Sequence, residues 1–304
     1  MIVRPKLHWF RMLFVWRGSV LARILPQLFA IVTLAVVVVL LHRFYPEWLP
    51  DLTPLPFTLL GIALAIFLSF RNSVSYDRFW EARKLWGAVL NDSRSLARQQ
   101  LSAADASPEQ NRRFVYSLIA FVHALHAQLR QDDATPVLQQ LLRPEAAAKI
   151  LRARFKPALV ILDLGQQLRT MRQQNQLSPI LFAAMDQQLS QLNACLGGCE
   201  RIASTPVPFA YSVILHRTVY CYSFLLPLGL VATLGVMTPL IVAFVAYTFL
   251  ALEALAEELQ DPFGTEPNDL ALDAMTEMIE STLREILGEE VSPPPAVPEN
   301  CIVT

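Results

Sequence analysis

The longest uncharged stretch of the chain limits its fold more than any other feature. Residues 218–252, 35 in a row, contain no Asp, Glu, Lys or Arg. As a single α-helix this stretch would be about 52 Å long, whereas the hydrocarbon core of a bilayer is about 30 Å thick. The sequence therefore predicts two membrane spans that fold back on each other between Gly235 and Pro239.

Two further uncharged stretches, residues 24–41 and 55–70, precede this run. The second is slightly short for a span, so a buried helix of a soluble core is the alternative for that segment taken alone. The whole chain is 54% apolar and 17% charged, whereas soluble domains carry about 25% charged residues. We therefore expect an all-α protein with four transmembrane helices, and the composition argues against a soluble enzyme and against a disordered chain.

Basic residues near the span ends predict the orientation. Residues 1–23 carry five Lys or Arg and no acid, and a basic cluster from Arg71 to Lys84 follows the second span. Because such residues collect on the cytoplasmic side, both termini and the middle region are predicted to be cytoplasmic. A cleaved signal peptide is the alternative for the N-terminus, but the apolar run is long and no small-x-small cleavage site follows it.

The middle region is predicted to be a helical cytosolic domain. Apolar residues recur at helical spacing between residues 111 and 131, and Ser178-Pro179 is typical of a helix start. Gly197-Gly198 is interpreted as the end of that helix, residues 102–110 and 132–136 as loops, and the chain from Gly288 as a disordered tail. The chain is predicted to have four parts. Residues 1–70 form the cytosolic N-terminal segment and spans one and two, and residues 71–217 form the helical cytosolic domain. Residues 218–256 form spans three and four, and residues 257–304 form an acidic cytosolic segment and a flexible tail.

Charge is distributed very unevenly along the chain. The net charge is −1, but residues 1–217 carry +11 and residues 218–304 carry −12. Both parts are expected on the cytoplasmic side, where opposite charges favour docking. Acids beside the cytosolic part of a pore would alternatively concentrate cations there.

The sequence carries no recognisable catalytic set. It has no nucleophile elbow, phosphate-binding glycine loop, zinc-protease helix or dinucleotide motif, and its dispersed basic residues do not indicate nucleic-acid binding. Cys195 and Cys199 lack a second ligand pair, and His123 and His126 are interpreted as packing residues of an amphipathic helix. The C-terminal Cys301-Ile-Val-Thr is interpreted as a chance match to a prenylation pattern. We expect neither an enzyme nor a required cofactor.

Two side-chain patterns recur every fourth residue in the second span. The small residues are Gly61, Ala65 and Ser69, and the bulky ones are Ile62, Ile66 and Phe70. A small face lets membrane helices approach closely, and the bulky stripe lies about 100° further round the helix. On spacing alone the stripe faces lipid or a protein core. Around an axis of several copies it would instead form apolar rings that gate by dewetting.

An acidic turn follows the fourth span. Glu258 and Asp261 precede a Pro-Phe-Gly turn, and Glu266 and Asp269 follow it. Such a turn can bring four carboxylates together, and Ca²⁺ binds sites rich in oxygen ligands. The spacing is not that of an EF-hand, and a solvated acidic loop is the alternative.

Five motifs together resemble the bestrophin family, most closely its bacterial homologues, over residues 4–285. They are Trp16-Arg-Gly-Ser19, the Ile62/Ile66/Phe70 stripe, Arg71-Asn-Ser-Val-Ser-Tyr-Asp-Arg78, Pro206-Val-Pro-Phe-Ala-Tyr211 and Asp261-Pro-Phe-Gly264. The resemblance implies a homopentameric ion channel of the bacterial inner membrane, with four transmembrane helices per subunit and one central pore.

The resemblance also implies roles for particular residues. Ile62, Ile66 and Phe70 correspond to the pore neck, and Ile180 to a cytosolic aperture. Glu258, Asp261, Glu266 and Asp269 correspond to the calcium clasp of animal members. Two clasp positions that are amides in animal members, 258 and 261, are acids here, and the run of consecutive aspartates is reduced to Glu-Pro-Asn-Asp.

The leading hypothesis is a bestrophin-type channel for small monovalent ions, with chloride and other anions as the family default. A cation (sodium)-selective channel of the same architecture is the first alternative. A membrane-anchored sensor or scaffold is the second. The expected partners are other copies of the chain, membrane lipids and the permeating ions, with no nucleic acid.

Overall fold

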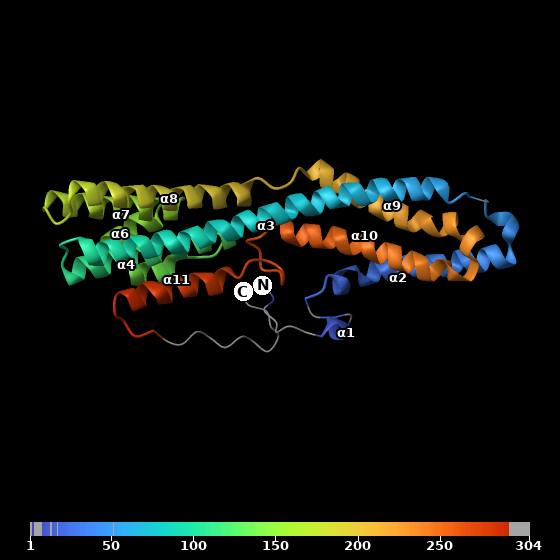
Figure 1. Cartoon of the computed structure of the whole chain (residues 1–304), viewed down its shortest axis with the longest axis horizontal. Helices are drawn as coiled ribbons and strands as arrows, with labels where there is room; N and C mark the ends of the chain where they lie inside the picture. The colour runs from blue at the N-terminus through green and yellow to red at the C-terminus, as the bar shows by residue number, and fades with distance from the viewer. Residues whose placement is uncertain (1, 3–7, 13, 17, 51, 292–304) are drawn as a thin grey trace. The chain divides into compact units, whose positions relative to one another are not determined.

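The computed structural model describes residues 2, 8–12, 14–16, 18–50 and 52–291. Eleven α-helices and two short 3₁₀ helices account for the regular structure of these residues, which form no extended strand (Figure 1). The predicted all-α class is therefore confirmed. The chain divides into two compact units: an apolar unit of residues 4–79 and 206–262, and an amphipathic unit of residues 1–3, 80–205 and 263–304.

Four long helical segments build the apolar unit. They are α2 (Leu21–Phe44), the first part of α3 (Leu55–Ala103), α9 (Phe209–Leu234) and α10 (Thr238–Gln260). Buried aliphatic side chains from all four form its core, including Ile31, Leu64, Leu68, Val219 and Val242. Two shorter elements, α1 (Trp9–Met12) and η1 (Pro46–Trp48), have no buried residue.

The predicted reversal of the 35-residue run is confirmed. The 3₁₀ helix η2 (Gly235–Met237) separates α9 from α10. Gly235 has a φ of +51°, a conformation that glycine adopts without the steric cost of a Cβ atom. Pro239 then lies in the first turn of α10, where its missing N–H costs no helical hydrogen bond.

Three helical stretches are long and apolar enough to cross a membrane: Leu21–Phe44, Leu55–Ala103 and Phe209–Gln260. The last contains α9 and α10, which at 26 and 23 residues correspond to about 39 Å and 35 Å. Each of these two helices is therefore long enough to cross a hydrocarbon core of about 30 Å.

Helix α3 does not end where its apolar stretch ends. It continues through 49 residues from Leu55 to Ala103, about 74 Å. The boundary predicted after residue 70 marks a change of composition inside one helix, whereas the compact units divide at 79/80, 205/206 and 262/263. The backbone hydrogen bonds of the helix continue through this change of composition. Both parts of α3 are rich in helix-forming residues, and neither contains a proline after the first turn of the helix.

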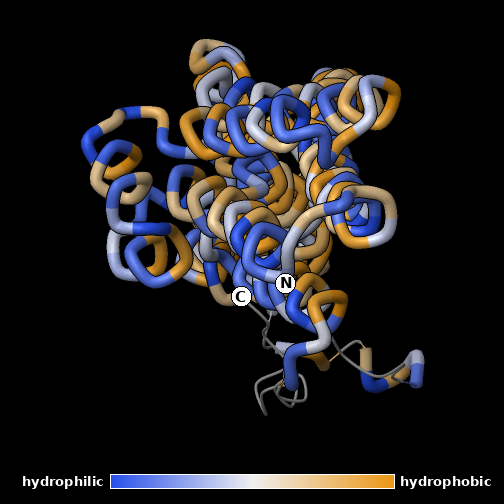
Figure 2. The backbone as a smooth tube through the Cα atoms, turned by 90° about the vertical axis from the view of Figure 1, so that its left-hand side faces the viewer, coloured by the Kyte–Doolittle hydropathy of each residue, from blue (hydrophilic) through white to orange (hydrophobic). Residues whose placement is uncertain are grey.

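The amphipathic unit contains the remaining helices and the second part of α3. They are α4 (Pro108–Arg130), α5 (Thr135–Leu141), α6 (Pro144–Leu151), α7 (Lys156–Gln173), α8 (Pro179–Ser204) and α11 (Leu272–Ile286). The predicted stripe of α4 is buried, with Phe114, Leu118, Phe121 and Leu125 inaccessible to solvent. Polar and apolar residues alternate around the helices that face the viewer in Figure 2, as expected for helices with one buried face.

Two local predictions in this unit were wrong in detail. Helix α8 continues through Gly197-Gly198 to Ser204. A Cβ atom on Gly198 would lie 2.9 Å from Leu85, so the glycine permits close packing against α3 rather than ending the helix. The predicted loops are also shorter, at residues 104–107 and 131–134, because Ser107 and Gln110 form a capping box that starts α4 and Asp133 accepts hydrogen bonds from Thr135.

The first residues after Gly288 are held against the helices, contrary to the predicted tail. The Glu289 carboxylate accepts hydrogen bonds from the Tyr116 hydroxyl at 3.1 Å and from Arg284 at 3.0 Å. Residues 292–304, including Cys301, lie outside the described part of the chain.

Candidate pore-lining site

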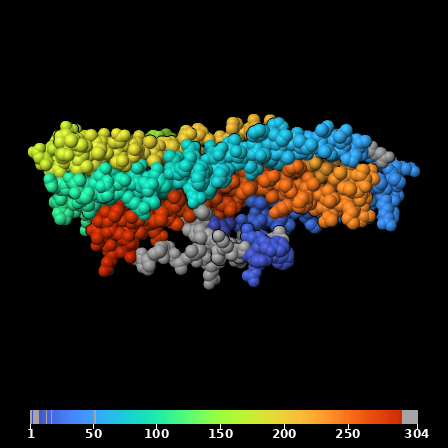
Figure 3. Space-filling model, viewed as in Figure 1, coloured from blue at the N-terminus to red at the C-terminus, as the bar shows by residue number. Residues whose placement is uncertain are grey.

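The bulky stripe of α3 lies on the side of the helix opposite its packed face. Ile62, Ile66 and Phe70 are 56%, 52% and 63% exposed, whereas Leu64 and Leu68 are 1% and 0% exposed. At about 100° per residue, Ile66 lies about 200° from Leu64. The core of the apolar unit therefore holds α3 by one face and leaves the stripe on the other, and Figure 3 shows a long face of α3 at the molecular surface.

The small face is packed only in part within this unit. The backbone at Gly61 meets Tyr222 of α9, and a Cβ there would lie 2.7 Å from the tyrosine hydroxyl. Ala65 and Ser69 are exposed. Gly61 thus lets α3 approach α9 closely within the chain, and a packing face of Gly61, Ala65 and Ser69 together stays a prediction.

Ile180 lies in the first turn of α8. The Ser178 hydroxyl accepts a hydrogen bond from the Leu181 N–H at 3.2 Å, which caps the helix as the sequence predicts. Ile180 is 85% exposed, an unusual environment for a large aliphatic side chain outside an apolar stretch. The role of Ile180 in a cytosolic aperture stays a prediction.

A buried polar cluster ties three helices of the apolar unit together. Glu253 of α10 has one carboxylate oxygen 2.6 Å from His216 Nδ1 of α9 and 3.8 Å from Arg71 Nη1 of α3. Arg71 and Glu253 are 4% and 6% exposed. This cluster was not predicted from the sequence. The available signal was Glu253, the first charged residue after 35 uncharged ones.

Further polar contacts join the same helices at successive turns. Asn72 Nδ2 donates to the Leu252 carbonyl at 3.1 Å, and Arg78 Nε donates to the Gln260 carbonyl at 3.0 Å. The contacts of Asn72 and Arg78 join α3 to α10 where the charged part of α3 begins. On the surface, Arg23 of α2 and Glu257 of α10 form an ion pair of 2.8 Å.

One residue of the predicted acidic clasp, Asp269, has a structural role within the single chain. Asp269 is buried, and its carboxylate accepts a hydrogen bond from the Glu266 N–H at 2.7 Å. Within the described residues, no group of three or more His, Cys, Asp or Glu side chains is placed to hold a metal ion. A divalent cation at Glu258, Asp261, Glu266 and Asp269 therefore stays a prediction.

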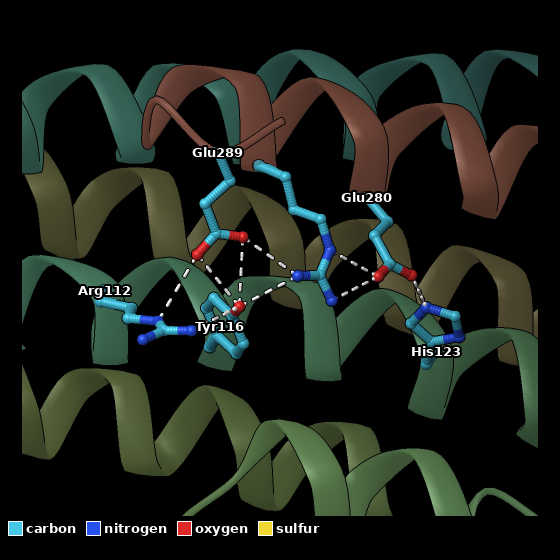
Figure 4. A network of polar contacts seen from close by, with 6 residues as sticks. Arg112, Tyr116, His123, Glu280 and Glu289 are labelled. Atoms are coloured by element: carbon cyan, nitrogen blue, oxygen red, sulfur yellow. Dashed lines mark hydrogen bonds and ion pairs between the residues drawn. The ribbon is translucent and has the colours of Figure 1, made fainter. Parts of the chain in front are cut away.

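The acidic C-terminal segment docks on the basic part of the amphipathic unit. On α4, His123 lies 2.6 Å from Glu280 of α11, and His126 lies 2.6 Å from Asp273. Arg284 links the carboxylate of Glu280 to Tyr116 (Figure 4). The hydrogen bond from His123 and the charge of Arg284 lower the pKa of Glu280, against the opposing effect of burial. His123 and His126 thus pair with acids rather than simply filling a core.

The cysteines of α8 are poor candidates for metal binding or redox chemistry. Burial raises the pKa of the Cys195 thiol to about 11 and that of Cys199 to about 12. A thiol must lose its proton to bind zinc or to attack an electrophile, so both groups are held in the unreactive form.

Long apolar helices with a polar cluster at their charged end define a helical membrane protein. Residues 1–285 match the family described as Bacterial/Fungal Bestrophin protein. A voltage-dependent anion channel-forming protein of Ralstonia nicotianae is 48% identical over 299 residues, 95% of each chain. One from Escherichia coli strain K12 is 43% identical over 98% of each chain.

The fold has the same relatives. A crystal structure of a bacterial bestrophin homologue from Klebsiella pneumoniae matches with a TM-score of 0.85 and 45% identity, over 88% of this chain and 100% of that one. The chain belongs to the bestrophin family. The expectation that it is not an enzyme is confirmed by this membership, because the family relatives are named as channel-forming proteins.

Proposed function

We propose that the chain is one subunit of a homopentameric bestrophin-type channel that conducts small monovalent anions through a central pore. The proposal gives each subunit four transmembrane helices, α2, the apolar part of α3, α9 and α10, with both termini in the cytoplasm of a bacterial cell. Support for anion conduction comes from the relatives of this chain, which are named as anion channel-forming proteins.

The observation that carries the pore assignment is the position of the bulky stripe on α3. Its three side chains face away from the subunit core, so they are available to face an axis shared by several copies. Rings formed by Ile62, Ile66 and Phe70 would be narrow and dry, and ions would pass when the rings widen enough to admit water. Ile180 would form a second apolar ring on the cytosolic side.

A flux assay separates a pore face from a lipid face. Liposomes containing purified protein with Ile62, Ile66 and Phe70 changed to Ala should pass chloride faster than wild-type liposomes, because smaller side chains lower the barrier to wetting. Phe244→Ala is the matched control, since Phe244 of α10 is 71% exposed but lies outside the stripe. Equal flux in the triple variant and the wild type, or an equal rise in Phe244→Ala, would contradict the gate.

Selectivity is tested by a reversal potential in a salt gradient. A potential near the chloride equilibrium value supports the proposal, and one near the cation equilibrium value supports the sodium-selective alternative. If acids of the C-terminal segment act on the permeating ions, Glu258→Gln and Asp261→Asn will shift this potential or the gating.

Assembly is tested independently of conduction. Chemical cross-linking in mild detergent should produce a ladder that ends at five subunits. Capture of monomers and dimers only would contradict the pentamer. Impermeable liposomes together with a specific cytosolic binding partner would instead support the sensor or scaffold alternative.

A further inference from the structure

The amphipathic unit contains a cavity of about 570 Å³ between the starts of α4 and α6 and the side of α7. This volume is within the range of small-molecule sites, about 300–1,000 Å³. Its polar wall includes Arg112, Arg113, Arg143, Gln110 and Gln176. Leu141, Leu142 and Ala146 provide an apolar wall. None of these residues belongs to the proposed conduction path.

Arg113 is paired only weakly inside this cavity. Its side chain is 33% exposed, and the nearest carboxylate oxygen, Asp163 Oδ1, is 3.8 Å from Nη2. The other oxygen of Asp163 already accepts a hydrogen bond of 2.7 Å from Gln167. Among the described residues the Arg113 guanidinium makes no hydrogen bond. An added anionic acceptor would stabilise a partly buried cation that makes no hydrogen bond.

Arg143 adds a second positive charge to the same cavity. Burial and the charge of Arg143 lower the pKa of Arg113, with Asp163 and Glu145 opposing them. Arg143 occupies the N-cap of α6, and its guanidinium, which has only donors, cannot accept from the first-turn N–H groups of that helix; Glu145 lies in the same turn. These features favour negative charge beside Arg143.

Two acids, Glu109 and Asp163, line the cavity together with three arginines. Arg112 is engaged elsewhere, because it donates to the Tyr116 hydroxyl at 3.2 Å and lies 3.4 Å from Glu289 (Figure 4). The ligand-facing cations are therefore Arg113 and Arg143.

We propose that this cavity binds a small oxyanion with at least two negative charges, held between Arg113 and Arg143. A guanidinium group donates paired hydrogen bonds to the oxygens of a phosphate or of a carboxylate, so either kind of anion would fit between the two arginines. The glutamine amides and the leucine wall would contact the rest of the molecule. The proposal concerns a ligand site in the amphipathic unit and is independent of the permeating ion.

Calorimetry on the full chain in detergent tests the site with two probes, inorganic pyrophosphate and citrate. Sodium chloride of equal ionic strength serves as the blank. Binding of pyrophosphate alone identifies a phosphate site, binding of citrate alone a carboxylate site, and binding of both a general oxyanion site. Failure of both probes to bind would overturn the proposal.

Three variants locate the binding. Arg113→Gln and Arg143→Gln should each weaken it about tenfold, the loss expected for one charge-assisted hydrogen bond. Arg143 is exposed, so Arg143→Gln tests the site even if Arg113→Gln does not fold. Arg169→Gln, an exposed arginine of α7 outside the cavity, should bind like the wild type. Unchanged binding in Arg143→Gln, or an equal loss in Arg169→Gln, would show that the anion binds elsewhere.

Discussion

Removing the carboxylate of Glu253 should destabilise the protein more than removing Glu253 and Arg71 together. Glu253 connects α3, α9 and α10 through Arg71 and His216, at 3.8 Å and 2.6 Å. With Glu253→Leu, the guanidinium of Arg71 stays buried at 4% exposure without its counter-charge. The double variant Arg71→Leu/Glu253→Leu leaves no uncompensated charge in this place.

The size of the effect follows from burial. Breaking a buried ion pair by removing one partner costs about 3–5 kcal/mol. The 3.8 Å separation is longer than a charge-assisted hydrogen bond, so we expect a loss of about 3 kcal/mol for Glu253→Leu. His216 adds little, because its side chain is 60% exposed and water can replace the lost contact.

Reversible unfolding in mixed detergent micelles, followed by circular dichroism, measures these free energies. The matched control is Glu257→Leu, one turn further along α10, whose partner Arg23 is 43% exposed and whose pair should contribute about 0–1 kcal/mol. The double variant should be more stable than Glu253→Leu by at least about 1 kcal/mol. A double variant no more stable than Glu253→Leu, or equal losses in Glu253→Leu and Glu257→Leu, would refute the reasoning.

Two further predictions concern packing and pH. Gly229→Ala would place a Cβ in steric conflict with the ring of Phe57, so it should lower the unfolding free energy by about 1–3 kcal/mol. Gly197→Ala, with no atom within 4 Å of its Cβ, should raise the unfolding free energy by up to about 1 kcal/mol in the same detergent assay. Equal effects of the two changes would contradict this packing. The lowered pKa of Glu280, due first to its hydrogen bond with His123, implies stability that is present above pH 4.5 and is lost as the pH falls below it. Glu280→Gln should therefore flatten the acid side of a pH–stability curve measured by thermal unfolding, and a curve as steep as that of the wild type would count against the pairing.

Several elements were predictable because they depend on local chemistry. The two halves of the 35-residue run and the reversal near Gly235 follow from the length of the uncharged run, and the buried face of α4 follows from helical spacing. The capping role of Ser178 was predictable in the same way, because a serine directly before a proline is a typical start of a helix.

The candidate site was predictable in part. The spacing of the bulky stripe was visible in the sequence, but spacing alone left its environment open between lipid, core and pore. The structure excludes the core of the same subunit, because Leu64 and Leu68 occupy that side of α3. Lipid and pore remain, and the resemblance to bestrophins, confirmed by the family match, favours the pore.

The sequence by itself determined that this chain is a helical membrane protein of the bestrophin family, because long uncharged stretches and ordered motifs depend on neighbouring residues alone. Tertiary structure decided which distant residues meet. It showed that Gly198 packs against Leu85 instead of ending α8, and that Glu253 reaches Arg71 across 182 positions of the chain. It also placed Arg113 and Arg143 beside one cavity. Such contacts depend on how helices pack, and their residues carry no periodic or local signal that would pair them in advance.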